Sequence, residues 1–198
     1  MRKEFADPVD RICWQSFDIR LLLQYMDLNT AITLIQTPLV NSPNPARWAE
    51  LGAGSGLFTK ALAQLLHPDS EIYAVDKKST PAFSDFPKAV NLHKLQLDFV
   101  LNDLPFHNLD GILMANSLHF VKDKTAFACK LKPVLKSEGM LIVVEYDMDI
   151  PVPDWVPYPV DILTLKDLFM EAGFAKVEML SEYPSVYGRT IYSATIQV

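Results

Sequence analysis

Short apolar segments alternate with amphipathic ones along most of the chain. Mainly apolar runs bounded by turn residues are typical of buried strands, and they cover residues 48–51, 71–76, 109–116 and 140–145. Residues 90–97 alternate between apolar and polar positions, which predicts a further strand. Apolar residues recur at helical spacing over residues 57–66, 123–135 and 165–172. Two closing strands are expected at residues 175–180 and 190–198. This alternation predicts an α/β fold with a Rossmann-like, doubly wound sheet.

The ends of two of these helices carry turn-forming residues. Gly139 is expected to lie just past the end of the helix at 123–135, where a glycine can take positive φ. The last helix is expected to begin at Thr164 and to end before Gly173.

Residues 1–46 precede the first strand and have a helical pattern. Asp10 is placed to cap a helix that runs through Leu28, and a second short helix is expected from Thr30 to Thr37. We therefore predict a helical cap over residues 1–46 and one globular domain over residues 47–198.

Three of the seven glycines of the chain stand close together between a predicted strand and a predicted helix, at Gly52, Gly54 and Gly56. Glycine lets a backbone approach a ligand, and the new helix points free N–H groups at the turn. A dinucleotide-binding G-x-G-x-x-G fingerprint would need its third glycine where Leu57 stands. No Gly-Lys-Ser/Thr triplet of a P-loop follows either.

Composition excludes several classes of protein. Of 198 residues, 49% are hydrophobic and 21% charged, as in an ordinary globular domain. A net charge of −6 argues against a basic nucleic-acid platform, so no nucleic-acid partner is expected. Cys13 and Cys129 are far apart and no metal-ligand spacing occurs, so no metal site is predicted. With no signal peptide and no apolar run of membrane-spanning length, we expect a cytoplasmic protein without a membrane span.

The order of several short motifs resembles that of the class I S-adenosylmethionine-dependent methyltransferases, of the small-molecule type 11/25 kind. Glu50 to Gly56 reads Glu-x-Gly-x-Gly-x-Gly, like the first motif of that family. Asp98 followed by Leu-Pro-Phe at 104–106 resembles the third motif, and Asn116 ends an apolar strand as in the fourth. Residues 168–174 closely match the Leu-Phe-x-x-Ala-Gly-Phe that ends the last helix of the family.

The resemblance covers about residues 45–198 and implies a fold and a cofactor. The fold is a seven-stranded sheet whose last strand is antiparallel, with N-terminal helices as a lid over the cleft. The cofactor is S-adenosyl-L-methionine, and S-adenosyl-L-homocysteine is the product. The residues that would bind it are Glu50, Gly52, Ala53, Gly54, Gly56, Asp76, Lys77, Asp98, Phe99, Asn116 and Ser117.

Three of these residues have a particular expected role. Asp76 ends the second strand, where a carboxylate can accept hydrogen bonds from both ribose hydroxyls. The resemblance places Asp98 at the adenine amino group and Asn116 beneath the methionine end of the cofactor.

Two residues are candidates for catalysis. Because the imidazole group in general suits proton transfer near neutral pH, His119 could act as a general base, although in the family this histidine is also a packing residue beside the cleft. Glu145 leaves the carboxyl end of a strand and could bind a substrate amine or take a proton. A strand-end acid that is merely tied to backbone is the alternative for Glu145.

The sequence gives weaker indications of the residues that would bind the methyl acceptor. The proline-rich segment 149–159 predicts a stiff loop that carries Trp155 and Tyr158, and a rigid connector is its alternative. Tyr146 and Arg189 complete the residues that we expect to face the substrate.

We predict methyl transfer to a small-molecule acceptor, by in-line attack on the sulfonium methyl, in a monomer or homodimer. A non-catalytic protein that binds S-adenosylmethionine or a nucleoside is the alternative. An NAD-dependent oxidoreductase is disfavoured, because Leu57 replaces the third fingerprint glycine and no Tyr-x-x-x-Lys pair is present.

Overall fold

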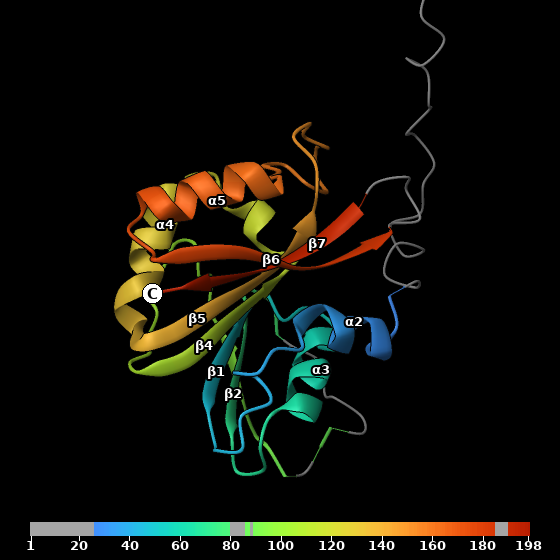
Figure 1. The fold of residues 1–198 in the computed structure, drawn as a ribbon, viewed down its shortest axis with the longest axis vertical. Coiled ribbons are helices and arrows are strands. Elements are labelled where there is room, and N and C mark those ends of the chain that lie inside the picture. Colours follow the sequence, from blue (N-terminus) through green and yellow to red (C-terminus); the bar gives the residue numbers. More distant parts are fainter. Residues whose placement is uncertain (1–25, 80–85, 88, 185–189) are drawn as a thin grey trace, which may run out of the picture.

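The computed structural model describes residues 26–79, 86–87, 89–184 and 190–198. The described residues form one seven-stranded sheet with helices on both faces (Figure 1). The strands are β1 (Arg47–Leu51), β2 (Glu71–Asp76), β3 (Asn91–Gln96), β4 (Leu109–Ala115), β5 (Leu135–Tyr146), β6 (Lys176–Pro184) and β7 (Thr190–Gln197). The helices are α2 (Leu28–Ile35), α3 (Leu57–Leu65), α4 (Lys124–Leu131) and α5 (Ile162–Glu171), with single 3₁₀ turns η2 (Leu118–Phe120) and η3 (Lys132–Val134).

The strand order is β3-β2-β1-β4-β5-β7-β6. Strands β1 to β5 pair in parallel, and β7 runs antiparallel between β5 and β6. The order reverses between β1 and β4, which is the point where ligands bind in open α/β sheets, outside the carboxyl ends of the strands. The predicted fold class is confirmed, including its antiparallel last strand.

The sheet is apolar on both faces because helices cover both. Trp48, Leu113 and Ile142 belong to the core under α2 and α3. The core on the other face lies under α4 and α5 (Figure 1). Gly111 is required for this packing, since a Cβ there would lie 2.3 Å from the ring of Trp48.

Three predicted helices have wrong boundaries, and the first of them, expected from Thr30 to Thr37, is α2 at Leu28–Ile35. The helix expected at 123–135 ends at Leu131, and residues 135–139 already belong to β5. Pro133 explains the early end, because proline lacks an N–H and its ring clashes with the preceding turn. The last helix begins at Ile162 rather than at Thr164, since the side chain of Asp161 accepts the Thr164 N–H at 2.8 Å and caps it.

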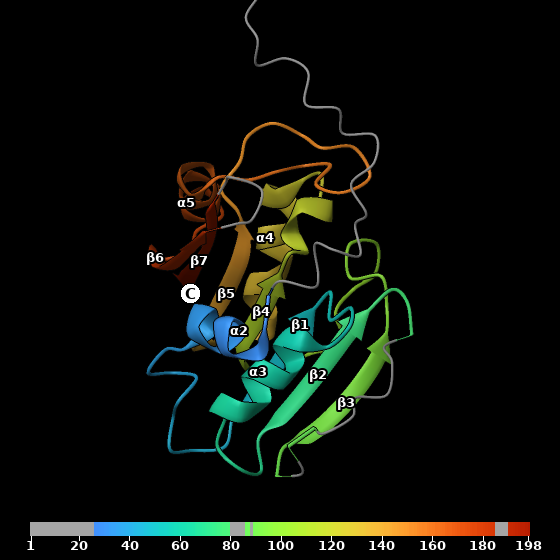
Figure 2. The same cartoon turned by 90° about the vertical axis from the view of Figure 1, so that its right-hand side faces the viewer.

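Helix α2 is the part of the predicted cap that the structure describes. Asp27 caps it through the N–H of Thr30 at 2.7 Å, so Leu28 opens this helix rather than ending an earlier one. The helix lies against α3 (Figure 2). The earlier helix predicted from Asp10 falls, up to residue 25, outside the described residues, and the lid therefore stays a prediction. No helix in the described part of the chain is long and apolar enough to span a membrane.

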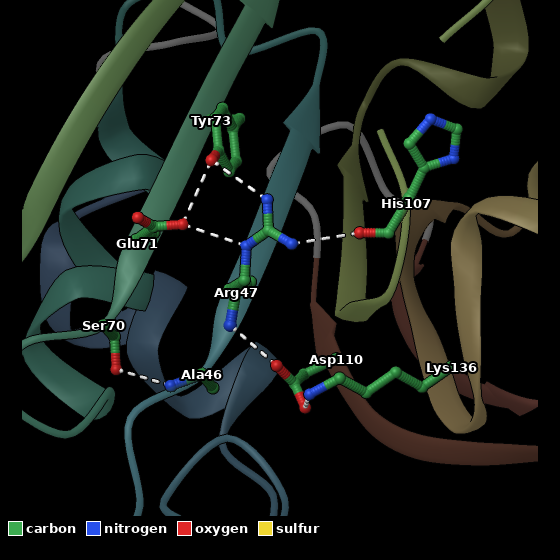
Figure 3. Close-up of polar contacts among 8 residues, drawn as sticks. All are labelled: Ala46, Arg47, Ser70, Glu71, Tyr73, His107, Asp110 and Lys136. Atoms are coloured by element: carbon green, nitrogen blue, oxygen red, sulfur yellow. Dashed lines mark hydrogen bonds and ion pairs between the residues drawn. The ribbon is translucent and has the colours of Figure 1, made fainter. Parts of the chain in front are cut away.

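Polar side chains tie the strands together at their amino ends (Figure 3). The Nε of Arg47 lies 2.9 Å from Oε2 of Glu71, and the N–H of Arg47 donates to Oδ2 of Asp110 at 2.8 Å. Lys136 Nζ lies 2.6 Å from Oδ1 of Asp110. Both cations beside this hollow of about 510 Å³ therefore already have carboxylate partners. The polar groups that are available to a ligand lie at the opposite end of the sheet, at the carboxyl ends of the strands.

Candidate functional site

The glycine loop between β1 and α3 has the conformation that its sequence predicts. Gly52, Gly54 and Gly56 all have positive φ, at 91°, 50° and 84°. The N–H groups of Gly52 and Ala53 donate to the carbonyl of Val75 on β2, at 2.8 and 3.0 Å. The loop is thereby held open across the carboxyl end of the sheet, with the N-terminus of α3 behind it.

Ser117 and Phe99 support this loop from within the protein. Ser117 is buried, and its hydroxyl donates to the carbonyl of Leu51 at 2.6 Å. A Cβ on Gly52 would lie 2.5 Å from the Cβ of Ser117, so only glycine fits. Phe99 is buried against Phe127, with ring centroids 5.8 Å apart. Both residues were predicted to bind cofactor, and their side chains shape the floor of the loop.

Asp76 and Asp98 end neighbouring strands, and both carboxylates bind backbone. Oδ2 of Asp76 accepts the Gly54 N–H at 2.9 Å, and Oδ1 accepts the Lys78 N–H at 2.8 Å. Oδ1 of Asp98 accepts the N–H groups of Val100 and Leu101, at 3.0 and 3.3 Å. Asp76 thus fixes the glycine loop in the free protein and retains lone pairs for a further donor.

Asn116 carries an unsatisfied polar atom at the switch point. The residue takes a left-handed φ of 51°, and its N–H donates to the carbonyl of Val144 at 2.8 Å. Its Oδ1 is buried and has no hydrogen-bond partner among the described residues. A buried acceptor without a donor costs about 1–3 kcal/mol. The atom therefore favours a ligand that brings an N–H or an ammonium group.

Glu50 lies beneath the loop rather than on its surface. Its side chain is buried and accepts a hydrogen bond from the hydroxyl of Thr59 on α3. Burial raises the pKa of Glu50 to about 8, and the charge of Asp76 adds to the rise, while the Thr59 hydrogen bond opposes it. Glu50 is consequently mostly protonated at neutral pH.

His119 and Glu145 form a buried pair, the His119–Glu145 dyad. Nδ1 of His119 lies 2.7 Å from Oε2 of Glu145, and the His119 N–H donates to Oε1 at 3.1 Å. The carboxylate keeps the ring proton on Nδ1, so Nε2 is the acceptor nitrogen. Nε2 itself makes no hydrogen bond within the described part of the chain. Two candidates that were predicted separately thus form one unit, and Glu145 is also tied to backbone.

The proline-rich loop after β5 lies against the η2 turn. Val152 and Val156 form an antiparallel bridge, so the loop closes on itself around Trp155. The Trp155 ring meets that of Tyr146 edge-on, with centroids 5.0 Å apart. Tyr158 is 39% exposed at the other limb of the loop. Of the predicted acceptor-facing residues, Arg189 lies outside the described ones.

Lys77 also extends toward η2. Its Nζ lies 5.8 Å from the ring centroid of Phe120, which is exposed on that turn. The side chain therefore crosses from the end of β2 to the segment that follows β4.

Sequence reasoning missed one residue near the dyad, Lys124, which lies not far from Tyr192. Lys124 is buried in the first turn of α4 and donates to the carbonyls of Val121 and Tyr158, at 2.8 and 2.7 Å. Tyr192 is buried on β7 and donates to the carbonyl of Val160 at 2.9 Å. A lysine in an amphipathic helix usually lies on the surface, so the sequence contains no indication of this role.

Residues 49–141, which include the glycine loop, Asp76, Asp98 and Asn116, match the family model of a methyltransferase domain. The matched segment is a methyltransferase domain. The strand order and the antiparallel β7 agree with this assignment.

Named relatives of this methyltransferase domain act on different molecules. A tRNA (guanine-N(7)-)-methyltransferase from Metamycoplasma hominis is 35% identical over 72 residues, which are 36% of this chain and 34% of that protein. The chain thus matches only about a third of that relative's length. The 1,6-didemethyltoxoflavin-N1-methyltransferase of Burkholderia thailandensis, solved with bound 1,6-didemethyltoxoflavin and S-adenosylhomocysteine, has a TM-score of 0.63 at 18% identity, covering 90% of this chain and 84% of that one.

A third similar protein is close in size as well as in fold. The S-adenosylmethionine-dependent methyltransferase of Aquifex aeolicus has a TM-score of 0.61 at 15% identity and covers 92% of this chain and 100% of its own. At such identities the two solved structures establish the fold and leave the acceptor open.

S-adenosylmethionine is the cofactor of this family, and the residues of the domain fit it. The unpartnered Oδ1 of Asn116 suits the ammonium of the methionine part. The glycine loop is exposed at Gly54, where an added Cβ would meet its nearest atom only at 3.9 Å. Asp76 offers carboxylate lone pairs at the end of β2, where the ribose is expected.

Proposed function

We propose that this methyltransferase domain binds S-adenosylmethionine and transfers its methyl group to a small-molecule acceptor by in-line attack. The observation that carries the proposal is the buried, unpartnered Oδ1 of Asn116 beside an open glycine loop. When bound, the cofactor supplies a methyl group on a positively charged sulfur. The chain supplies binding, orientation and a site from which water is excluded.

Different predicted residues would bind different parts of the cofactor. The glycine loop, with Glu50 beneath it, would hold the methionine part against Asn116. Asp76 would bind the ribose, with Lys77 beside the adenine. Asp98 and the backbone of Phe99 would bind the adenine edge. Ser117 acts indirectly, because its side chain is committed to the carbonyl of Leu51.

The dyad is the candidate base. His119 would accept a proton at Nε2 from an O–H or N–H nucleophile, and Glu145 would stabilise the imidazolium through Nδ1. Glu145 is therefore a positioning residue, since both of its oxygens bind His119.

The acceptor is expected to be apolar or aromatic. Tyr146, Trp155 and Tyr158 supply aromatic surface on or beside the stiff loop. Arg189, which lies outside the described residues, is the cationic candidate for the acceptor site. Residues 1–46 would form the cap of the cleft and residues 47–198 the catalytic domain, as monomer or homodimer.

Calorimetric titration with S-adenosylmethionine, S-adenosylhomocysteine and NADH tests the cofactor. We expect micromolar binding of the first two and none of NADH. Failure of the folded protein to bind either sulfur nucleoside would contradict the proposal. Turnover is then sought by following S-adenosylhomocysteine release across a panel of phenols, amines, thiols and carbon acids.

Variants of Asn116 test the observation that carries the proposal. Asn116→Gly keeps the left-handed backbone and removes the acceptor, so it should weaken S-adenosylhomocysteine binding by about tenfold or more. Asn116→Asp keeps an acceptor oxygen and should bind more tightly than Asn116→Gly. Equal affinities of the two variants and the parent chain would remove Asn116 from the site.

A non-catalytic S-adenosylmethionine-binding protein is the second candidate. The burial of the dyad favours it, because His119 is only 2% exposed and Glu145 only 1%. Cofactor binding without turnover on any acceptor of the panel would support this alternative.

A further inference from the structure

The position of Lys124 is energetically unfavourable for a charged lysine. It opens α4, and a cation at a helix N-terminus opposes the helix dipole. Its side chain is buried, and burial lowers its pKa to about 8, although attraction to Glu145 opposes the shift. No carboxylate of the described residues pairs with it directly. Something in the fold must therefore compensate for the charge.

The compensation comes from two main-chain carbonyls. Nζ of Lys124 lies 2.8 Å from the carbonyl oxygen of Val121 and 2.7 Å from that of Tyr158. It also lies 5.8 Å from the centroid of the Tyr158 ring. One ammonium thus joins the segment before α4 to a segment 34 residues further along the chain.

Tyr158 is consequently held at both ends of its backbone. Its N–H donates to the carbonyl of His119 at 3.1 Å, while its own carbonyl accepts from Lys124. Beyond it, the hydroxyl of Tyr192 binds the carbonyl of Val160 at 2.9 Å.

The other limb of the loop is different. Val152 and Val156 bond to each other, at 3.0 and 2.8 Å, and so make a closed turn around Trp155. That turn packs on the core, since Val156 is 1% exposed and the Trp155 ring meets Tyr146, whereas the limb that follows it is fastened by Lys124.

We propose that Lys124 is a positioning residue that fastens the loop 149–159 to the η2 turn and so sets the wall of the acceptor site. This inference rests on the proposed function only in that the loop faces the acceptor. Lys124 contacts Val121, the residue that directly follows η2, and Tyr158 of the loop, and none of these bonds reaches the glycine loop. Its loss should therefore change the acceptor wall and leave cofactor binding intact.

Hydrogen exchange of the full chain, followed by mass spectrometry, tests the fastening without any ligand. Lys124→Met removes the donors at similar side-chain volume, and Lys124→Arg keeps them. Lys132→Met is the matched control, because Lys132 also donates to a main-chain carbonyl, that of Gly173, at a distant place.

We expect Lys124→Met to speed exchange in the peptide covering 154–160 by about tenfold or more, because local opening becomes easier. Lys124→Arg should restore protection, and Lys132→Met should leave this peptide unchanged. Parent-like exchange in a folded Lys124→Met variant would overturn the inference. If that variant does not fold, Lys124→Leu, which also lacks a donor, replaces it, and equal exchange of the Leu and Arg variants would overturn the inference as well.

A second measurement separates this inference from the proposed function. Lys124→Met should bind S-adenosylhomocysteine with a Kd within about twofold of the parent chain, because it touches none of the expected cofactor residues. Loss of this binding only in Lys124→Met would overturn the positioning role. Loss in every variant and in the parent would overturn the proposed function and leave the exchange result standing. With an acceptor in hand, Lys124→Met should raise KM far more than it lowers kcat.

Discussion

Replacing Glu50 with Gln should remove a pH-dependent cost from the folded state. Burial raises the pKa of Glu50 from 4.5 to about 8. Between these two values the unfolded chain releases a proton that the folded chain retains. Raising the pH through this window therefore lowers the free energy of unfolding. The neutral amide of Gln has no proton to release and can still accept the hydrogen bond of Thr59.

The magnitude follows from the width of the window. One pKa unit corresponds to about 1.4 kcal/mol, so a rise from about pH 5.5 to about pH 7.5 should cost the parent chain about 2–3 kcal/mol relative to Glu50→Gln. Urea unfolding followed by circular dichroism, at both pH values, measures this difference.

Glu71→Gln is the matched control for Glu50→Gln. Hydrogen bonds from Arg47 and Tyr73 lower the pKa of Glu71, so its contribution is present above its unfolded pKa and is lost as the pH falls. The control should thus show a pH trend of opposite sign, and a small one because the pair is partly exposed. If the stability difference between the parent chain and Glu50→Gln is independent of pH, Glu50 is not buried as a neutral acid and the reasoning fails.

Three further substitutions test the loop and the core. Asp76→Ala should weaken S-adenosylhomocysteine binding by about 1.5–3 kcal/mol in calorimetry, through lost charge-assisted hydrogen bonds, and an unchanged Kd would place Asp76 outside the site. Gly52→Ala should abolish that binding, since its Cβ would lie 2.5 Å from Ser117 at a φ of 91°; a Kd equal to the parent's would show that the loop is not the site. Gly111→Ala should lower the free energy of unfolding by about 1–3 kcal/mol, because the new methyl meets the ring of Trp48, and thermal unfolding with an unchanged Tm would contradict this.

Much of the fold could be predicted from the sequence, because the features that determine it lie within single segments of the chain. A run such as residues 140–144 is apolar throughout because helices cover both faces of β5, and burial on both faces leaves no alternation. The glycine loop was readable for a similar reason, since its backbone needs positive φ at three positions. The helix ends were less accurate. Asp161 and Thr164 are both residue types that cap helices. In the structure Asp161 is the cap, so Thr164 lies within the helix.

The pairing of distant residues was not readable from the chain. His119 and Glu145 were each predicted as candidates, yet their contact exists because β4 and β5 are neighbours in the sheet. Lys124 had no local indication at all, because its partner is a backbone carbonyl, and every residue carries one.

The sequence alone therefore settles the order of strands and helices and the residues that line the glycine loop, since backbone conformation and burial leave a periodic pattern in the chain. Only the tertiary structure brings distant groups together. The pairing of β4 with β5 joins His119 to Glu145, which are 26 residues apart, and the docking of the proline-rich loop joins Tyr158 to Lys124, which are 34 residues apart. Their hydrogen bonds depend on distance and direction in three dimensions, which no spacing along the chain encodes.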